Sequence, residues 1–129
     1  MARTVVHTGG APKAIGPYSQ AIKVQVSEML YCSGQVGLDP ASGELVSGGV
    51  EPEAKRAMEN IRAVLSAAGL TFENVVKTTI FLVDMNDFAK VNAVYGSFFE
   101  KDPPARSTVA VAALPKAARV EIEAIAVVR

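Results

Sequence analysis

The sequence predicts an α+β fold in which two helices pack on one face of a single mixed β-sheet. Apolar and β-branched runs of strand length occur near both ends and in the middle of the chain, and two stretches have apolar residues at helical spacing. Gly and Pro residues separate these segments. Their order, which is strands, helix, strand, helix and two strands, is typical of α+β proteins. The 129 residues fit one domain, predicted to span residues 1–129.

The first third of the chain is predicted to form three strands. Residues 3–7 form a short strand that ends at a Gly- and Pro-rich segment. Residues 21–26 alternate as a half-buried strand does, and the next two residues are expected to be the turn of a hairpin whose second strand begins at Met29. That strand runs into Gly34. A glycine there indicates a bulge, or a close approach of the backbone to a ligand or another chain.

Two amphipathic helices are predicted. The first begins near Pro52, which suits a first helical turn, and ends before Gly69. The second follows capping residues at 84–86. Its apolar stripe consists of Phe88, Val91, Tyr95 and Phe98. We interpret both stripes as core, whereas Asn92 lies one step off the second stripe and faces either a cleft edge or solvent.

The later strands are predicted to need cover on both faces. Residues 75–83 are rich in β-branched side chains and predict a central strand. Residues 105–113 and 119–128 predict two last strands joined as a hairpin. Apolar residues occupy both sides of the strands at 109–114 and 124–128, and 50% of all residues are hydrophobic. A partner subunit is therefore expected to cover the face without helices.

Composition argues against several functional classes. Thirteen basic and thirteen acidic residues leave no net charge, and no basic cluster exceeds a pair, which argues against nucleic-acid binding. The single cysteine, Cys32, excludes an intramolecular disulfide, fits a reducing compartment and is interpreted as core. No His/Cys cluster predicts a metal site, and no apolar run approaches the ~20 residues of a membrane span. We expect a soluble, cytoplasmic protein that binds no metal or membrane.

Arg106 is the first candidate site residue. Pro103 and Pro104 fix the backbone just before a strand, which places the guanidinium at a strand entrance, where side chains meet a cleft. A guanidinium matches a carboxylate with two parallel hydrogen bonds. The sequence therefore indicates an anion clamp, and the alternative is a surface arginine at a strand end.

Glu121 is the second candidate, because it interrupts the otherwise apolar final strand. Its carboxylate could position water near a group that binds an acid. In a hairpin, however, Glu121 would lie opposite residue 111 or 112, roughly 16 to 20 Å along the strand from Arg106. The two residues are therefore expected to meet only across a subunit interface or through an irregular register.

Several motifs resemble those of the reactive intermediate deaminase A (RidA, or YjgF) family, in the same order and at family-like spacing, over about residues 12–128. The motifs are Gly16-Pro17-Tyr18-Ser19-Gln20-Ala21, Ser33-Gly34-Gln35, Val76-Lys77-Thr78-Thr79, Asn86-Asp87-Phe88 with Val91-Asn92, Pro104-Ala105-Arg106-Ser107, and Leu114-Pro115-Lys116 leading to Ile122-Glu123-Ala124. The resemblance implies a chorismate-mutase-like fold and a homotrimer with clefts between subunits. It also implies hydrolysis of 2-imino acids and their enamine tautomers to 2-keto acids and ammonia, the substrates being 2-aminoacrylate/2-iminopropanoate and 2-iminobutanoate.

The same resemblance implies roles for individual residues. Arg106 would bind the substrate carboxylate, Gly34 would offer a backbone contact, and Glu121 would orient or activate water. Further positions implied to contact substrate are Tyr18, Ser33, Asn92 and Thr108. Thr108 stands where many bacterial relatives carry Cys, so a role that needs a thiol is not expected.

The implied chemistry agrees with the residues present. A protonated imine carbon is already electrophilic, so neither a covalent nucleophile nor a cofactor is expected. One alternative is a non-catalytic trimer that binds small carboxylates or acts as a chaperone-like protein. An endoribonuclease or translation inhibitor is a further alternative, against which the neutral net charge counts. Chorismate mutase activity would rest on fold likeness alone.

Overall fold

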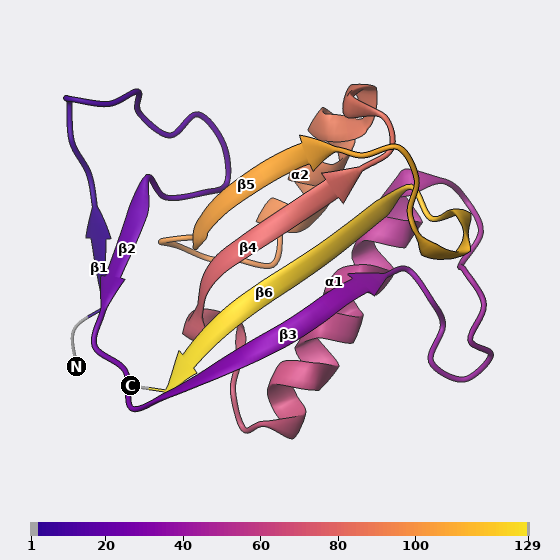
Figure 1. Ribbon diagram of the computed structural model, residues 1–129, viewed down its shortest axis with the longest axis horizontal. Helices are drawn as coiled ribbons and strands as arrows, with labels where there is room; N and C mark the ends of the chain where they lie inside the picture. The colour runs from indigo at the N-terminus through magenta and orange to yellow at the C-terminus, as the bar shows by residue number, and fades with distance from the viewer. Residues whose placement is uncertain (1–2, 129) are drawn as a thin grey trace.

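The computed structural model, which describes residues 3–128, contains a four-stranded mixed sheet, two helices on one of its faces and a separate two-stranded pair (Figure 1). The predicted arrangement of two helices on a mixed sheet is confirmed. The strands are β1 (Arg3–Val6), β2 (Ala21–Val24), β3 (Glu28–Val36), β4 (Val75–Leu82), β5 (Ala105–Ala110) and β6 (Val120–Val128). The helices are α1 (Val50–Ala67) and α2 (Phe88–Gly96), with short 3-10 turns η1 (Phe72–Asn74), η2 (Met85–Asp87) and η3 (Pro115–Ala117).

The order of the sheet is β3-β6-β4-β5, and this corrects the predicted hairpin between the last two strands. Strand β5 pairs in parallel with β4, with Arg106 beside Thr78, whereas β6 pairs antiparallel with both β3 and β4. Helix α2 connects β4 to β5, and a connection through a helix lets the second strand run parallel to the first. Because β5 occupies one edge of β4, β6 pairs with the other edge.

The predicted hairpin at residues 21–32 is also wrong. Strand β2 pairs with β1, with Arg3 beside Val24, and these two strands lie apart from the main sheet (Figure 1). Strand β3 instead pairs with β6, and the amide of Ser27 donates to the carbonyl of Val128 at 2.9 Å. The alternation along residues 21–26 is correct for a half-buried strand, but alternation does not specify the neighbouring strand.

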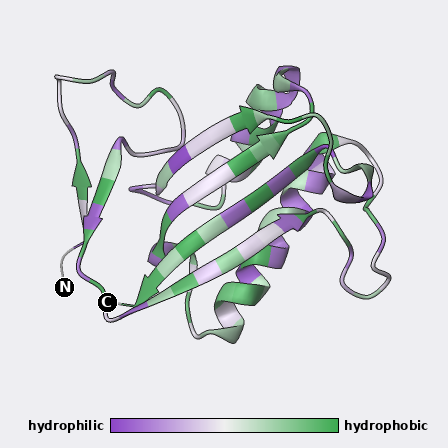
Figure 2. Cartoon of the chain, in the orientation of Figure 1, coloured by the Kyte–Doolittle hydropathy of each residue, from purple (hydrophilic) through white to green (hydrophobic). Residues whose placement is uncertain are grey.

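The core lies between the sheet and the two helices. The predicted stripe of α1 is buried from Ala54 to Leu65, but Ala68, also predicted to belong to it, follows the helix and is exposed. The β4 and β6 side chains opposite the stripe, such as Ile80 and Ile122, are buried as well. Burial of each such aliphatic side chain contributes about 1.5–3 kcal/mol. Along β6 the first residues alternate between hydrophobic and hydrophilic, and the strand then becomes hydrophobic (Figure 2). The alternation assigns Ile122 to the helix side and its neighbour Glu121 to the open face.

The open face of the sheet carries exposed apolar side chains. Met29, Tyr31 and Val109 have 48%, 69% and 40% of their surface accessible in the single chain. The helices lie behind the sheet in Figure 1, so none of them covers these residues. Such a surface is typical of an interaction face.

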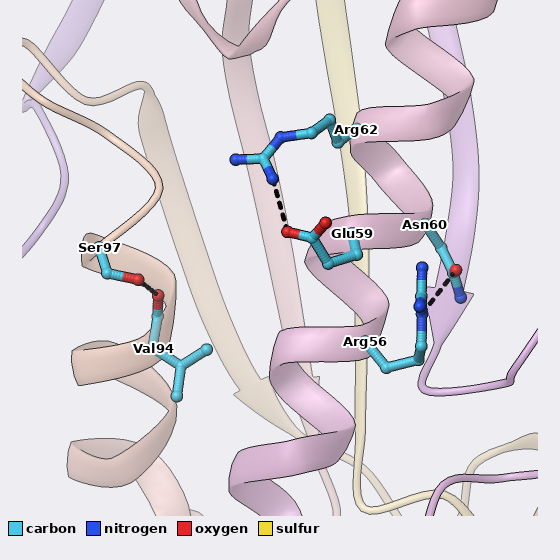
Figure 3. Close-up of polar contacts among 6 residues, drawn as sticks. All are labelled: Arg56, Glu59, Asn60, Arg62, Val94 and Ser97. Carbon is cyan, nitrogen blue, oxygen red and sulfur yellow. Dashed lines mark hydrogen bonds and ion pairs between the residues drawn. The ribbon is translucent and has the colours of Figure 1, made fainter.

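Helix α1 also fixes the end of β3, which carries Gly34. The side-chain amide of Asn60 donates to the carbonyls of Val36 and Leu38 at 3.3 and 2.9 Å. Arg56 Nε in turn donates to Asn60 Oδ1 at 3.1 Å, one helical turn away (Figure 3). These contacts hold the chain as it leaves the sheet beside β6.

Within residues 3–128, no helix is long and apolar enough to cross a membrane. Nor does that part of the chain gather three or more His, Cys, Asp or Glu side chains in a group that could hold a metal ion.

Candidate active site

Arg106 lies half-buried at the start of β5, among side chains from α2 and from the loop before β2. Its Nη1 donates to Asn92 Oδ1 at 2.7 Å. The guanidinium carbon lies 5.2, 5.6 and 5.3 Å from the ring centres of Tyr18, Phe88 and Tyr95. Cation–π attraction at these distances stabilises the charged group between the rings. We refer to these five residues as the arginine cluster.

The local sequence explains how the cluster forms. Arg106 pairs with Thr78 of β4 and therefore points to the same side of the sheet, toward α2. On α2, the cluster residues Phe88, Asn92 and Tyr95 are three or four positions apart, so they share one helix face. The prediction left open whether Asn92 faces a cleft edge or solvent, and the structure places it against Arg106.

The two prolines before Arg106 attach the segment that carries Tyr18. Both carbonyls accept hydrogen bonds from Ser19: its hydroxyl donates to Pro103, and its amide donates to Pro104 at 3.1 Å. The phenol oxygen of Tyr18 also accepts a hydrogen bond from the amide of Ile15 at 3.4 Å. The proline pair thus fixes a strand entrance and a neighbouring loop together.

Burial determines the electrostatics of the arginine cluster. Burial lowers the pKa of the Arg106 guanidinium, while the nearby phenols of Tyr95 and Tyr18 raise it. A guanidinium remains charged in proteins even so. Burial raises the pKa of Tyr95 to about 12, against the opposing effects of its 2.6 Å hydrogen bond with Thr78 and of Arg106. Tyr95 is therefore neutral at physiological pH.

No acidic side chain within residues 3–128 forms an ion pair with Arg106, and its hydrogen bond to Asn92 uses one of its five donors. A half-buried cation without a carboxylate beside it favours an anion supplied from outside the chain. The remaining donors can bind a carboxylate through two parallel hydrogen bonds.

Thr108 lies two residues after Arg106 and on the same side of the sheet, beside Ile80 of β4. Its hydroxyl oxygen is buried and has no hydrogen-bond partner within residues 3–128. A buried polar group without a partner destabilises the fold by about 1–3 kcal/mol.

The substitution Thr108→Val is therefore expected to raise the free energy of unfolding by about 1 kcal/mol, because valine keeps the shape and removes the unpaired hydroxyl. Chemical denaturation of the purified protein measures this. Ser107→Ala is the matched control at an exposed neighbour whose hydroxyl accepts a hydrogen bond from Lys77. A midpoint that falls in Thr108→Val would contradict the expectation.

Glu121 and Gly34 form a second group. A Cβ placed on Gly34 would lie 2.0 Å from Oε2 of Glu121, so the carboxylate rests directly against the Gly34 backbone. The register of β3 on β6 shifts between Cys32 and Gln35, which places Gly34 in a bulge. The predicted bulge is confirmed, whereas the close neighbour of the Gly34 backbone within residues 3–128 is a side chain of the same chain. Ser33 is exposed beside it, and we refer to Ser33, Gly34 and Glu121 as the glutamate cluster.

The two clusters lie on opposite faces of the sheet. Arg106 is beside Thr78 of β4, and Glu121 is beside Phe81 of the same strand, three residues further on. An odd separation along a strand reverses the face. The sequence predicted that Arg106 and Glu121 are far apart along a hairpin. In the structure the two residues are separated because β4 lies between β5 and β6.

Sequence reasoning did not assign Phe88 and Tyr95 to the site, because both belong to the apolar stripe of α2. Their rings serve the core and Arg106 at once. The signal available in the sequence was that Phe88 and Tyr95 each lie about one helical turn from the polar residue Asn92.

Cys32 is buried, and burial raises the pKa of its thiol, which disfavours the reactive thiolate.

The fold and the arginine cluster together define a small α+β protein with a half-buried arginine that forms no ion pair within residues 3–128. Residues 8–128 match the family described as Endoribonuclease L-PSP. The chain belongs to this family, which is the RidA (YjgF) family, and the resemblance noted from its motifs is confirmed.

Relatives of known name are similar over nearly the full length. The chain is 60% identical over 125 residues to a mouse (Mus musculus) protein named 2-iminobutanoate/2-iminopropanoate deaminase, which covers 97% of this chain and 91% of the relative. It is 58% identical over 127 residues to Protein DfrA of Myxococcus xanthus, covering 98% and 97%. Among solved structures, TdcF of E. coli with bound serine has a TM-score of 0.76 at 43% identity, covering 98% of this chain and 99% of that one.

Proposed function

We propose that this protein hydrolyses 2-imino acids, such as 2-iminobutanoate and 2-iminopropanoate, to 2-keto acids and ammonia. The observation that carries the proposal is the arginine cluster, which presents a half-buried cation without an acidic partner in the described chain. The names of relatives that are 56% to 60% identical support the choice of substrate. TdcF, whose structure contains serine, is a related protein that binds a small molecule with a carboxylate.

In this proposal Arg106 binds the substrate carboxylate, and the rings of Tyr18, Phe88 and Tyr95 keep the guanidinium in one orientation. Asn92 occupies one guanidinium nitrogen, which leaves the other donors for the two carboxylate oxygens. Thr108 lies next to the substrate along β5. Fixing the carboxylate also fixes the attached imine carbon, which is a large part of the catalytic effect.

Glu121 supplies the water-directing group. Its carboxylate removes a proton from a water molecule as the water oxygen bonds to the protonated imine carbon, and the C=N electron pair moves to nitrogen. Glu121 then returns this proton to the nitrogen of the resulting carbinolamine. The C–N bond breaks with its electron pair leaving on ammonia, and the hydroxyl proton passes to the Glu121 carboxylate as the carbonyl forms. A carboxylate that receives no hydrogen bond from residues 3–128 can accept that proton, and Ser33 and the Gly34 backbone lie beside it.

A homotrimer would bring the two clusters together. Because they lie on opposite faces of one sheet, a complete site needs the arginine cluster of one copy and the glutamate cluster of another. The exposed apolar residues of the open face are available to pack between copies.

Gly34→Ala tests the contact between Gly34 and Glu121. The new methyl group would displace the carboxylate, which is the flexible end of its side chain, so we expect a stability change below about 1 kcal/mol. The turnover number should fall by about 10- to 100-fold, because a displacement of about 1 Å at a reacting group costs that much. Gly9→Ala, at an exposed position with open space around it, is the control. Unchanged turnover in Gly34→Ala would show that the carboxylate position is unimportant.

The function itself is tested by generating 2-iminobutanoate in place with a threonine dehydratase and following the loss of the imine. The protein should accelerate this loss above the spontaneous rate, and its native mass should be that of three chains. Saturable binding of 2-oxobutanoate without acceleration would instead favour the non-catalytic carboxylate-binding alternative. Cleavage of RNA that persists through purification would favour the endoribonuclease activity in the family description.

A further inference from the structure

Two nearly inaccessible carboxylates meet at Arg119, outside both clusters. Glu53 of α1 and Asp87 of η2 are 3% and 5% exposed. Glu53 Oε1 accepts a hydrogen bond from the Arg119 amide at 2.8 Å, and Asp87 Oδ2 forms an ion pair with Arg119 Nη2 at 2.9 Å. The Arg119 carbonyl accepts a third bond, from the amide of Val83 at 3.2 Å. Burying two carboxylates is unfavourable unless they are paired, so this residue is held firmly.

The position of Arg119 along the chain gives this arrangement its importance. Arg119 directly precedes β6 and is two residues before Glu121, so fixing its amide and carbonyl fixes how β6 enters the sheet. Asp87 directly precedes α2, whose first residue, Phe88, belongs to the arginine cluster. One ion pair thus joins the start of the strand that bears Glu121 to the start of the helix that lines Arg106.

Glu53 extends the same link to the third strand of the site. Gly37 packs so closely on the backbone of Glu53 that an added Cβ would lie 2.7 Å from its Cα and carbonyl oxygen. Gly37 directly follows β3, which carries Gly34. The segments that carry Gly34, Glu121 and Phe88 therefore all contact the Glu53–Asp87–Arg119 group.

We propose that Arg119 is a positioning residue that holds the start of β6 and so places the glutamate cluster that each chain contributes to a site shared with another copy. This inference rests on the proposed imine hydrolysis. Without its guanidinium, Asp87 keeps a buried charge with no partner, and α2 and β6 lose the side chain that joins them. Binding through Arg106 needs only one cluster, whereas the attack of water needs both. Loss of Arg119 thus slows the chemical step more than it weakens binding.

The test compares Arg119→Met, which keeps the length of the side chain, with Arg119→Lys, which keeps its charge. Arg119→Met should lower the turnover number for 2-iminobutanoate by about 10- to 100-fold while KM changes less than about threefold. Arg119→Lys should recover most of this loss. Calorimetry with 2-oxobutanoate should give nearly wild-type affinity for both variants.

The control is Arg62→Met, which removes an exposed ion pair with Glu59 on α1 (Figure 3). It should match the wild type in turnover number and in KM. If Arg119→Met does not fold, Asp87→Asn provides the same comparison with a neutral partner of equal size. Wild-type turnover in folded Arg119→Met or Asp87→Asn, or an equal loss of binding and turnover, would overturn the inference. A wild-type protein that leaves the imine at its spontaneous rate would refute the proposed function instead.

Discussion

Replacing Arg106 with alanine is expected to lower kcat/KM for 2-iminobutanoate by about 10²- to 10³-fold, because a partner in a buried, charge-assisted hydrogen bond contributes about 2–5 kcal/mol or more. Arg106→Lys should recover only a small part, since an ammonium group cannot form the two parallel hydrogen bonds of a guanidinium. Binding of 2-oxobutanoate, measured by calorimetry, should weaken in parallel. The assay is the loss of imine above the spontaneous rate.

Arg62→Ala is the control for removing an arginine elsewhere on the surface, and it should behave as the wild type. If Arg106→Ala keeps its affinity for 2-oxobutanoate, another group binds the carboxylate and the arginine cluster is not the substrate site.

Glu121→Gln is expected to lower the turnover number by about 10²- to 10⁴-fold with little change in KM, because the amide has the shape of the carboxylate but cannot accept a proton. Its stability should remain close to that of the wild type, since no donor within residues 3–128 bonds to the carboxylate. Single-turnover measurement of 2-iminobutanoate hydrolysis separates this effect on the chemical step from binding.

Glu123→Gln is the matched control, because Glu123 lies two residues further along β6, is exposed and points to the same face. Equal losses in the two variants would indicate a general effect of charge on this face. Wild-type turnover in Glu121→Gln would exclude the carboxylate as the water-directing group.

The helices and strands of this fold were largely predictable, whereas their pairing was not. The apolar stripe of α1 predicts a core helix face and the β-branched run of β4 predicts a central strand, and both are confirmed except at Ala68, which is exposed. The alternation along β2 contains no information about whether β1 or β3 lies beside it. Similarly, two consecutive strands such as β5 and β6 suggest a hairpin until the crossover through α2 makes β5 parallel to β4.

The candidate site was predictable to the extent that its residues are chemically unusual for their position. Arg106 after two prolines and Glu121 in an apolar strand both stand out in the sequence. Phe88 and Tyr95 do not stand out, because an aromatic ring that packs on a guanidinium has the same helical spacing as one that packs only in the core. The contact of Glu121 with Gly34 depends on the register of β3 on β6, which only the structure supplies.

The opposite-face placement of the two clusters constrains the symmetry of any assembly that completes the site. In such an assembly each chain would contribute one cluster to the copy on one side and the other cluster to the copy on the other side, which is a head-to-tail contact. A ring closed in this way has as many sites as chains, whereas a pair related by a two-fold axis would join like surfaces. A monomer released by dilution would still contain every residue of the site and yet have no complete site.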